Sequence, residues 1–326
     1  MLRKNKCLAI LVSILLVCFL SFVGGCQKQA QKPAPKSLKP VKLAPEVSKY
    51  KTEPNITLFR KATGEKQNLK LEEYLKGVVA AEIGPKYPPE ALKAQAIVAR
   101  TMTLALLEYE NGTRQKHNTD ASDDHTEFQA YDEKKITPAI SKAVDATRGQ
   151  VLTYNGKFVY ALFHSLSKDK TASIIEGFPK LKNKASAYIV PVKTNGMKYA
   201  PAKYKSWTVK VPRWEVKNIM GAKAGSLDDI RISKRGPSGR ALTISAGKTS
   251  MSAAMLREKI GFDRLYSTVL SSVKAEGNNI IFKGSGWGHG CGMEQWGAYT
   301  MAKEGKKVNQ IVGHYFPSTR LTTLYK

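Results

Sequence analysis

A helical pattern runs through the stretch Leu71-Glu-Glu-Tyr-Leu-Lys-Gly-Val-Val-Ala-Ala-Glu82. Its apolar stripe consists of Leu71, Leu75, Val78 and Val79. Glu82 takes the next position of the same stripe. A carboxyl group held against apolar surface resists ionisation, so its pKa rises and it keeps a proton near neutral pH. The pattern predicts a helix ending in a candidate general acid, although a glutamate that turns out to water fits the same spacing.

A second helix is predicted after the break at Gly84-Pro85. Pro88-Pro89-Glu90 is typical of a helix start, and the pattern then continues from Ala91 to about Tyr109. Lys93 and Arg100 share one face of this helix, two turns or about 10 Å apart along its axis. This places two cations on the helix that follows Glu82.

The rest of the chain alternates between helical and strand-like blocks. A helix is expected at 138–147, and Asn155-Gly156 predicts a tight hairpin between 150–154 and 157–163. Further strands are expected at 207–211, 241–245 and 279–283. Because helices and antiparallel strands come in separate blocks, we expect an α+β fold, with a helical catalytic segment packed against antiparallel sheet around a substrate groove.

The amino terminus has the pattern of an exported protein. Arg3, Lys4 and Lys6 precede an apolar run over 8–23, which is followed by Gly24-Gly25-Cys26. This is typical of a secretion signal, and the small-small-Cys ending resembles the lipobox of bacterial lipoproteins, in which Cys26 would be lipidated. An uncleaved membrane anchor is the alternative, although the run is short for a spanning helix. Both interpretations place the body on the extracytoplasmic face of the cell membrane.

Charge and composition refine this prediction. Residues 27–51 are rich in proline and lysine and are expected to form a tether, which leaves 52–326 as one folded domain. The 326 residues contain 53 Lys and Arg against 26 Asp and Glu, a formal net charge of +27. Such an excess favours a polyanionic partner. Because the chain is predicted to be exported, we expect this partner in the cell envelope, as an anionic membrane surface or an acidic cell-wall polymer, and no nucleic acid.

Few residues of the body are suited to hold a metal. Cys291 is its single cysteine, which excludes an intramolecular disulfide and a paired-cysteine metal site. A polar loop gathers five side chains that could bind a metal, namely His117, Asp120, Asp123, Asp124 and His125. Loop acids are more often simply solvated, so we expect no metal and no cofactor.

Glycine occupies every second position of Gly284-Ser-Gly-Trp-Gly-His-Gly-Cys-Gly292. If the segment is extended, one face is bare and the other carries Ser285, Trp287, His289 and Cys291. An indole and an imidazole suit sugar stacking and hydroxyl binding. A tight packing seam beneath another sheet is the alternative.

Two possible nucleophiles have weak support. His164-Ser165-Leu166-Ser167 lacks a Gly-x-Ser-x-Gly elbow and an identifiable acid, so a polar groove lining is expected there instead of a hydrolase site. Cys291 lies two residues from His289, which is not how thiol and imidazole groups are assembled in known Cys/His sites.

Several motifs in register resemble the SpoIID/LytB family, which is named for stage II sporulation protein D. They are Val78-Val79-Ala80-Ala81-Glu82, Ala91-Leu92-Lys93-Ala94-Gln95-Ala96, Ala99-Arg100-Thr101, Gln129-Ala130-Tyr131, Thr147-Arg148-Gly149-Gln150-Val151-Leu152, Phe163-His164-Ser165-Leu166-Ser167 and Gly288-His-Gly-Cys-Gly-Met-Glu-Gln-Trp-Gly-Ala298. The match continues through His314-Tyr315-Phe316-Pro317 to the end of the chain.

The resemblance implies a lytic transglycosylase that cleaves peptidoglycan glycan strands after an amidase has removed their stem peptides. Glu82 matches the catalytic acid of the family. The expected substrate-binding residues are Lys93, Gln95, Arg100, Gln129, Tyr131, His164, Ser165, Ser167, Trp287, His289 and Gln295. Some relatives are thought to hold zinc through a cysteine pair, where this chain has Asp123 and Phe128. A non-catalytic wall-binding protein that stimulates an amidase is the alternative, because that role is ascribed to some relatives.

Overall fold

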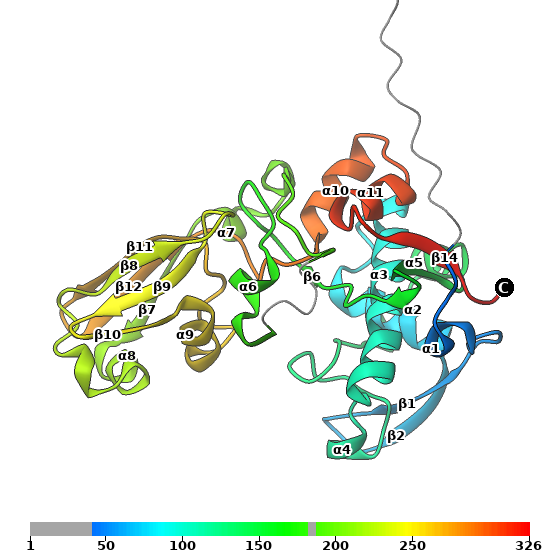
Figure 1. Ribbon diagram of the computed structural model, residues 1–326, viewed down its shortest axis with the longest axis horizontal. Coiled ribbons are helices and arrows are strands. Elements are labelled where there is room, and N and C mark those ends of the chain that lie inside the picture. The colour runs from blue at the N-terminus through cyan, green and yellow to red at the C-terminus, as the bar shows by residue number, and fades with distance from the viewer. Residues whose placement is uncertain (1–40, 182–186) are drawn as a thin grey trace, which may run out of the picture. The chain divides into compact units, whose positions relative to one another are not determined.

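The structure is a computed structural model that describes residues 41–181 and 187–326 (Figure 1). The chain divides into two units at Pro40, and the first unit lies wholly outside the described residues. The expected signal segment, the lipidation site Cys26 and most of the expected tether therefore lie outside them as well. Within the described part, no helix is long and apolar enough to cross a membrane.

The folded body begins earlier than the expected residue 52. A short helix, α1 (Pro45–Ser48), lies within the expected tether, and its Val47 is fully buried. The backbone N–H of Ala44 donates to the carbonyl of Gly156 at 3.0 Å. Lys49 and Tyr50 add contacts with Glu108, so this stretch belongs to the folded body. The surrounding lysines and prolines made the composition resemble that of a tether.

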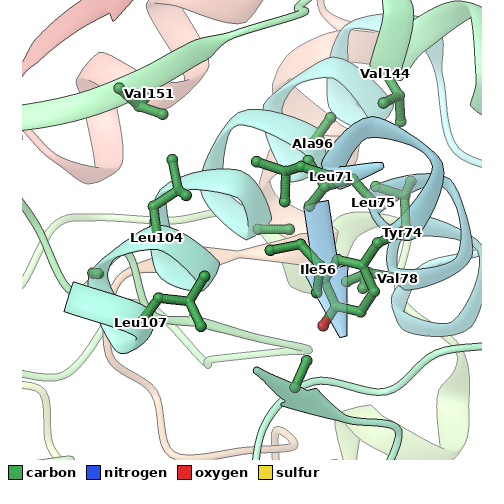
Figure 2. Packing of buried hydrophobic residues seen from close by; sticks show 14 of the residues in the cluster. Ile56, Leu71, Tyr74, Leu75, Val78, Ala96, Leu104, Leu107, Val144 and Val151 are labelled. Carbon is green, nitrogen blue, oxygen red and sulfur yellow. The ribbon is translucent and has the colours of Figure 1, made fainter. Parts of the chain in front are cut away.

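Two long helices build the first core. They are α2 (Leu71–Glu82) and α3 (Pro89–Glu110), and both pack against α5 (Pro138–Asp145). Figure 2 shows side chains of α2 and α3 gathered around Ile56 of the neighbouring strand. The helical spacing in the sequence predicts both helices correctly, and Glu82 is the last residue of α2.

Two small sheets flank these helices. In the first, β1 (Asn55–Phe59) pairs antiparallel with β2 (Lys66–Lys70) and parallel with β3 (Ala121–Ser122). In the second, β4 (Gln150–Tyr154) lies between β5 (Lys157–Phe158) and β14 (Arg320–Thr323), antiparallel to both. The Asn155-Gly156 hairpin is confirmed, but its second strand ends at Phe158 and not at 163. The chain turns there, because the N–H of Leu162 bonds to the carbonyl of Tyr160.

A second core lies between α3 and the end of the chain. Its elements are β6 (Phe163–His164), β13 (Met293–Glu294), α10 (Gln295–Lys303) and α11 (Val308–Tyr315). Strands β6 and β13 pair in parallel, with Phe163 opposite Met293 and His164 opposite Glu294. This pairing joins two of the sequence motifs that lie about 130 residues apart.

The segment 207–284 has its own hydrophobic core. One sheet has the order β11 (Leu270–Glu276), β12 (Asn279–Gly284), β7 (Trp207–Pro212), and the other has the order β10 (Thr249–Ser252), β9 (Ala241–Ala246), β8 (Arg231–Arg235). All pairings in both sheets are antiparallel. Helices α8 (Arg213–Met220) and α9 (Ala253–Ile260) contribute to the same core.

Short helical turns complete the described elements. They are α4 (Arg114–His117), α6 (Ile174–Gly177), α7 (Ala202–Lys205) and the 3-10 turns Glu133–Lys135, Pro179–Leu181, Gly196–Lys198 and Ala222–Ala224. Helices and mostly antiparallel strands occupy separate stretches of the chain, so the expected α+β class is confirmed.

Candidate active site

A cavity of about 730 Å³ brings together residues that are far apart in the sequence. Its volume falls within the range of about 300–1,000 Å³ that small-molecule sites have. The side chains that line it include those of Glu82, Gln129, His164, Arg257, Trp287 and His289. They come from helices α2 and α9, the loop before α5, strand β6 and the glycine-rich segment.

The side chain of Glu82 lies against the interior of the protein at the end of α2. Its Oε1 accepts a hydrogen bond from the backbone N–H of Ala130 at 3.2 Å. Burial raises the pKa of Glu82 to about 7, while hydrogen bonds from Ala130 and from the side chain of Gln295 oppose part of that rise. The carboxyl group therefore carries a proton in a large fraction of molecules at neutral pH, as its place on the apolar stripe predicts.

Amide side chains surround this carboxyl group. Gln295 contacts Glu82, and its Nε2 approaches Oε1 of the fully buried Gln95 at 3.5 Å. Gln129 lines the cavity, donates from Nε2 to Thr103 Oγ1 at 2.8 Å, and has an Oε1 atom without a partner among the described residues. The side chain of Gln129 also lies close to the buried hydroxyl of Tyr74. Gln95, Gln129 and Gln295 thus fix the polar surroundings of Glu82.

The two cations expected near substrate lie elsewhere. Arg100 is fully buried and donates to Glu72 through Nε at 2.9 Å and through Nη2 at 2.5 Å. Lys93 pairs with Glu90 at 2.8 Å, and neither cation lines the cavity. The structure therefore gives Arg100 a role in joining α3 to α2 in place of the expected contact with substrate.

Two other expected binding residues, Tyr131 and Ser165, are not part of the cavity lining. Tyr131 stacks on Tyr74 with ring centroids 5.7 Å apart, and Arg60 lies 5.1 Å from its ring. Ser165 offers its backbone carbonyl to the N–H of Trp296. Both residues support the walls of the site and do not line it.

The expected Ser/His pair is a buried hydrogen-bond chain. His164 Nδ1 lies 3.2 Å from the carbonyl of Cys291, which can only accept, so this nitrogen carries the proton. His164 Nε2 then accepts from Ser167 Oγ at 2.7 Å, and Ser167 in turn accepts from Arg240 Nη2 at 3.0 Å. Because Ser167 is fully buried and does not line the cavity, it fixes the orientation of His164 and is not a nucleophile.

The glycine-rich segment is not a regular strand. Gly286, Gly288, Gly290 and Gly292 all have positive φ, a conformation in which side chains are strained. A Cβ atom at Gly290 would lie only 2.4 Å from Cζ of Arg240, so the guanidinium packs directly on the backbone. The backbone at Gly290 is therefore closely packed, but against an arginine side chain and not beneath another sheet.

The residues between the glycines do not share one face, contrary to expectation. Trp287 and His289 line the cavity, but the thiol of Cys291 points away from it and donates to the carbonyl of Ser173 at 3.2 Å. Burial raises the pKa of Cys291 to about 12. A thiol with that pKa is protonated at neutral pH, which excludes it as a nucleophile.

Trp287 forms an aromatic surface within the cavity. Its ring stacks on Tyr266 with centroids 4.2 Å apart and remains partly exposed. His289 accepts from the backbone N–H of Cys291 at Nδ1, at 3.1 Å. Burial and the nearby Arg257 and Arg240 lower its pKa to about 3, so it is neutral. An indole face and a neutral imidazole are suited to a carbohydrate ligand.

The acidic loop residues are engaged in ion pairs and hydrogen bonds. Asp123 pairs with Arg60, and Asp124 pairs with Lys61 at 2.5 Å. Asp120 pairs with Arg114, and His117 bonds to Glu127 at 2.7 Å. His125 lines the cavity. These contacts stabilise the loop against β1 and beside the opening of the cavity.

Sequence reasoning missed several buried charged residues near the site. Glu294 is fully buried, accepts from the N–H of Ser167 at 2.6 Å and has a pKa raised by burial to about 7. Arg240 and Arg257 are buried in the segment 207–284. Arg257 had a detectable signal, because it shares the buried side of α9 with Ala253, Leu256 and Ile260. A charged residue on an apolar stripe is the same signal that marked Glu82.

Family models match two parts of the chain. The model described as stage II sporulation protein matches residues 60–154, which contain Glu82, and a model described as a domain of unknown function matches residues 181–292. The second match covers the segment that supplies Arg240, Arg257, Trp287 and His289 to the site.

Curated relatives cover most of the chain. It is 32% identical over 304 residues to stage II sporulation protein D of Bacillus subtilis, an alignment that covers 89% of this chain and 83% of that protein. It is 31% identical over 275 residues to the protein of the same name from Bacillus amyloliquefaciens, covering 80% and 77%. The amidase enhancer of Bacillus subtilis is 28% identical over 299 residues, covering 76% of this chain and 40% of that protein. The chain belongs to the stage II sporulation protein D family.

Proposed function

We propose that this protein is a lytic transglycosylase of the cell wall that cleaves the bond between N-acetylmuramic acid and N-acetylglucosamine in peptide-free glycan strands. The observation that carries the proposal is the carboxyl group of Glu82, which lines a cavity of about 730 Å³ and has a pKa raised to about 7. Family membership and the carbohydrate-compatible lining from Trp287 and His289 support it.

In the proposed reaction one carboxyl group acts twice. Protonated Glu82 donates its proton to the glycosidic oxygen as the bond between that oxygen and C1 of the muramic acid breaks. The resulting carboxylate then accepts the proton of the C6 hydroxyl, and O6 bonds to C1 to close a 1,6-anhydro ring. The proton returns to Glu82, no water is consumed, and no second carboxylate is needed, unlike in a two-carboxylate hydrolase.

The other carboxyl groups that line the cavity are less suited to this role. Hydrogen bonds from His117 and Lys116 lower the pKa of Glu127. Both oxygens of Glu176 already accept hydrogen bonds, from Ser173 and from Ser238. Glu258 and Asp263 are exposed to solvent. Glu82 alone combines burial in the cavity with a pKa near 7.

A second candidate function follows from the similarity to the amidase enhancer. On this alternative the protein binds the wall without cleaving it and stimulates an N-acetylmuramoyl-L-alanine amidase. The first function requires the carboxyl group of Glu82 to cleave the glycan strand, whereas the second involves no cleavage of the strand by this protein.

Location and partners are also proposals. We propose that the body acts on the extracytoplasmic face of the membrane, anchored by lipid at Cys26, on glycan strands prepared by an amidase. The net charge of +27 supports an anionic wall polymer as the partner. Globomycin, which blocks lipoprotein processing, should cause an unprocessed precursor to accumulate. A processed chain without lipid would refute the anchor.

The reaction is tested by mass spectrometry of peptide-free glycan strands after incubation with the purified protein. We expect ends 18 Da lighter than a reducing end, and their loss in Glu82→Gln. Glu127→Gln is a matched control, because it removes a carboxyl group from the lining of the same cavity and should retain cleavage. Ends that contain an added water would show hydrolysis, and intact strands that still bind the protein would favour the amidase-stimulating function.

A further inference from the structure

The cavity contains a buried cation that the proposed reaction does not use. Arg257 on α9 lines the cavity together with Glu82, although the two residues are 175 positions apart. Lys180 also lines it, but its side chain is exposed and lies 3.4 Å from Glu258. Arg257 is only 8% exposed. It is therefore the cation that is best shielded from solvent in this lining.

The guanidinium of Arg257 is held in place without an ion-pair partner. Its Nε donates to the carbonyl of Leu265 at 2.7 Å, and its Cζ lies 4.6 Å from the centre of the Phe262 ring. Neither contact uses the two terminal nitrogens. No carboxylate within 41–181 or 187–326 forms an ion pair with them, and Asp263 acts only through its field. The guanidinium is thus held in one orientation, and its two terminal nitrogens remain available as hydrogen-bond donors.

A second buried arginine adds to the positive potential. Arg240 is fully buried, and its Nε and Nη1 atoms have no hydrogen-bond partner among the described residues. Burial lowers the pKa of Arg257 most, and the positive field of Arg240 lowers it further. His164 and His289 are neutral, so they neither add to nor offset this charge. The carboxyl groups of Glu176 and Glu294 offset part of the charge of Arg240, whereas Arg257 has no ion-pair partner among the described residues. A buried cation without such a partner is costly unless an anion binds.

We propose that Arg257 is an anion subsite that binds the lactyl carboxylate of a muramic acid residue whose stem peptide has been removed. Two terminal N–H groups in a planar fork match the two oxygens of a carboxylate. A stem peptide converts that carboxylate to a neutral amide and adds bulk, so this subsite selects peptide-free strands. This inference rests on the proposed function and identifies Arg257 as the residue that recognises the peptide-free substrate.

Binding in the Glu82→Gln background tests the subsite without any cleavage. Calorimetric titration compares short peptide-free glycan strands with the same strands after conversion of their lactyl carboxylates to methylamides. We expect the free carboxylates to bind at least about tenfold more tightly, which corresponds to about 1.4 kcal/mol. Equal affinity for the two glycans overturns the proposal, whatever the variants show.

Variants then assign any preference to Arg257. Arg257→Met should reduce it to within about twofold, while Arg257→Lys should retain part of it, because lysine keeps the charge but not the fork. Lys259→Met is the matched control. It removes the same charge from an exposed position of α9 outside the cavity and should keep the full preference. A full preference in Arg257→Met, or in Arg257→Lys if the methionine variant does not fold, overturns the proposal.

These outcomes differ from those that test the reaction. A protein that cleaves nothing but loses its preference in Arg257→Met contradicts the proposed function and leaves the anion subsite standing. A protein that forms anhydro ends but treats the two glycans alike contradicts only the subsite.

Discussion

Replacing Glu82 by glutamine should stabilise the protein at high pH and leave its stability at low pH almost unchanged. In the unfolded chain the carboxyl group ionises with its ordinary pKa of 4.5, and in the folded chain with a pKa of about 7. Between these values the folded state binds the additional proton, so the free energy of unfolding falls as pH rises. At about 1.4 kcal/mol for each pH unit, the difference amounts to about 3 kcal/mol above pH 7.

Urea denaturation of the wild-type protein and Glu82→Gln at pH 4 and pH 8 measures this difference. The variant should gain about 3 kcal/mol relative to wild type on going from pH 4 to pH 8. Glu127→Gln is the control with the opposite sign, because hydrogen bonds from His117 and Lys116 lower the pKa of Glu127 and its charge stabilises the folded state. A stability gap between wild type and Glu82→Gln that does not vary with pH would show that Glu82 is solvated and that its pKa is not raised.

Three further predictions concern the site and its supports. The kcat/KM for glycan cleavage should fall tenfold for each pH unit above about 7, as Glu82 loses its proton; a rate that is level to pH 9 would exclude it as the acid. Arg100→Met should destabilise the protein by about 3–5 kcal/mol in urea denaturation, because Glu72 stays buried without its partner. The KM for glycan cleavage should not change. A raised KM with normal stability would instead support a substrate-binding role for Arg100. Cys291→Ala should keep full activity. Cys291 of the native wild-type protein should also resist iodoacetamide, because its thiol is buried and protonated; peptide mass spectrometry separates it from Cys7, Cys18 and Cys26, and rapid alkylation of Cys291 would contradict this.

Local periodicity was sufficient to place Glu82 but not Arg100. On α2 Glu82 continues an apolar stripe at helical spacing and therefore stands out, but the same spacing gave no sign that Glu72 is buried and pairs with Arg100. Helix α3 is buried on nearly all sides, with Gln95 and Arg100 inside together with the apolar residues. Because such a helix has no solvent-exposed face, its sequence does not show which side faces the cavity. The position of Lys93 and Arg100 on one face therefore did not predict which groups they contact.

The remaining parts of the site depend on long-range contacts that spacing does not encode. Glu82 meets Gln295 and shares its cavity with Arg257 only after chain segments about 200 residues apart have packed together. The shared face of Ser285, Trp287, His289 and Cys291 depends on an extended glycine-rich segment, which the structure does not have. The positive φ angles of this segment follow from close contacts such as that of Gly290 with Arg240, which the sequence does not reveal.

The central claim is that the carboxyl group of Glu82 cleaves glycan strands without water. Its most direct measurement is the mass of the ends that the wild-type protein and Glu82→Gln produce from peptide-free strands in ¹⁸O-labelled water. We predict 1,6-anhydro ends without ¹⁸O from the wild-type protein and none from Glu82→Gln. Ends that carry ¹⁸O, or anhydro ends that persist in the variant, would contradict the account.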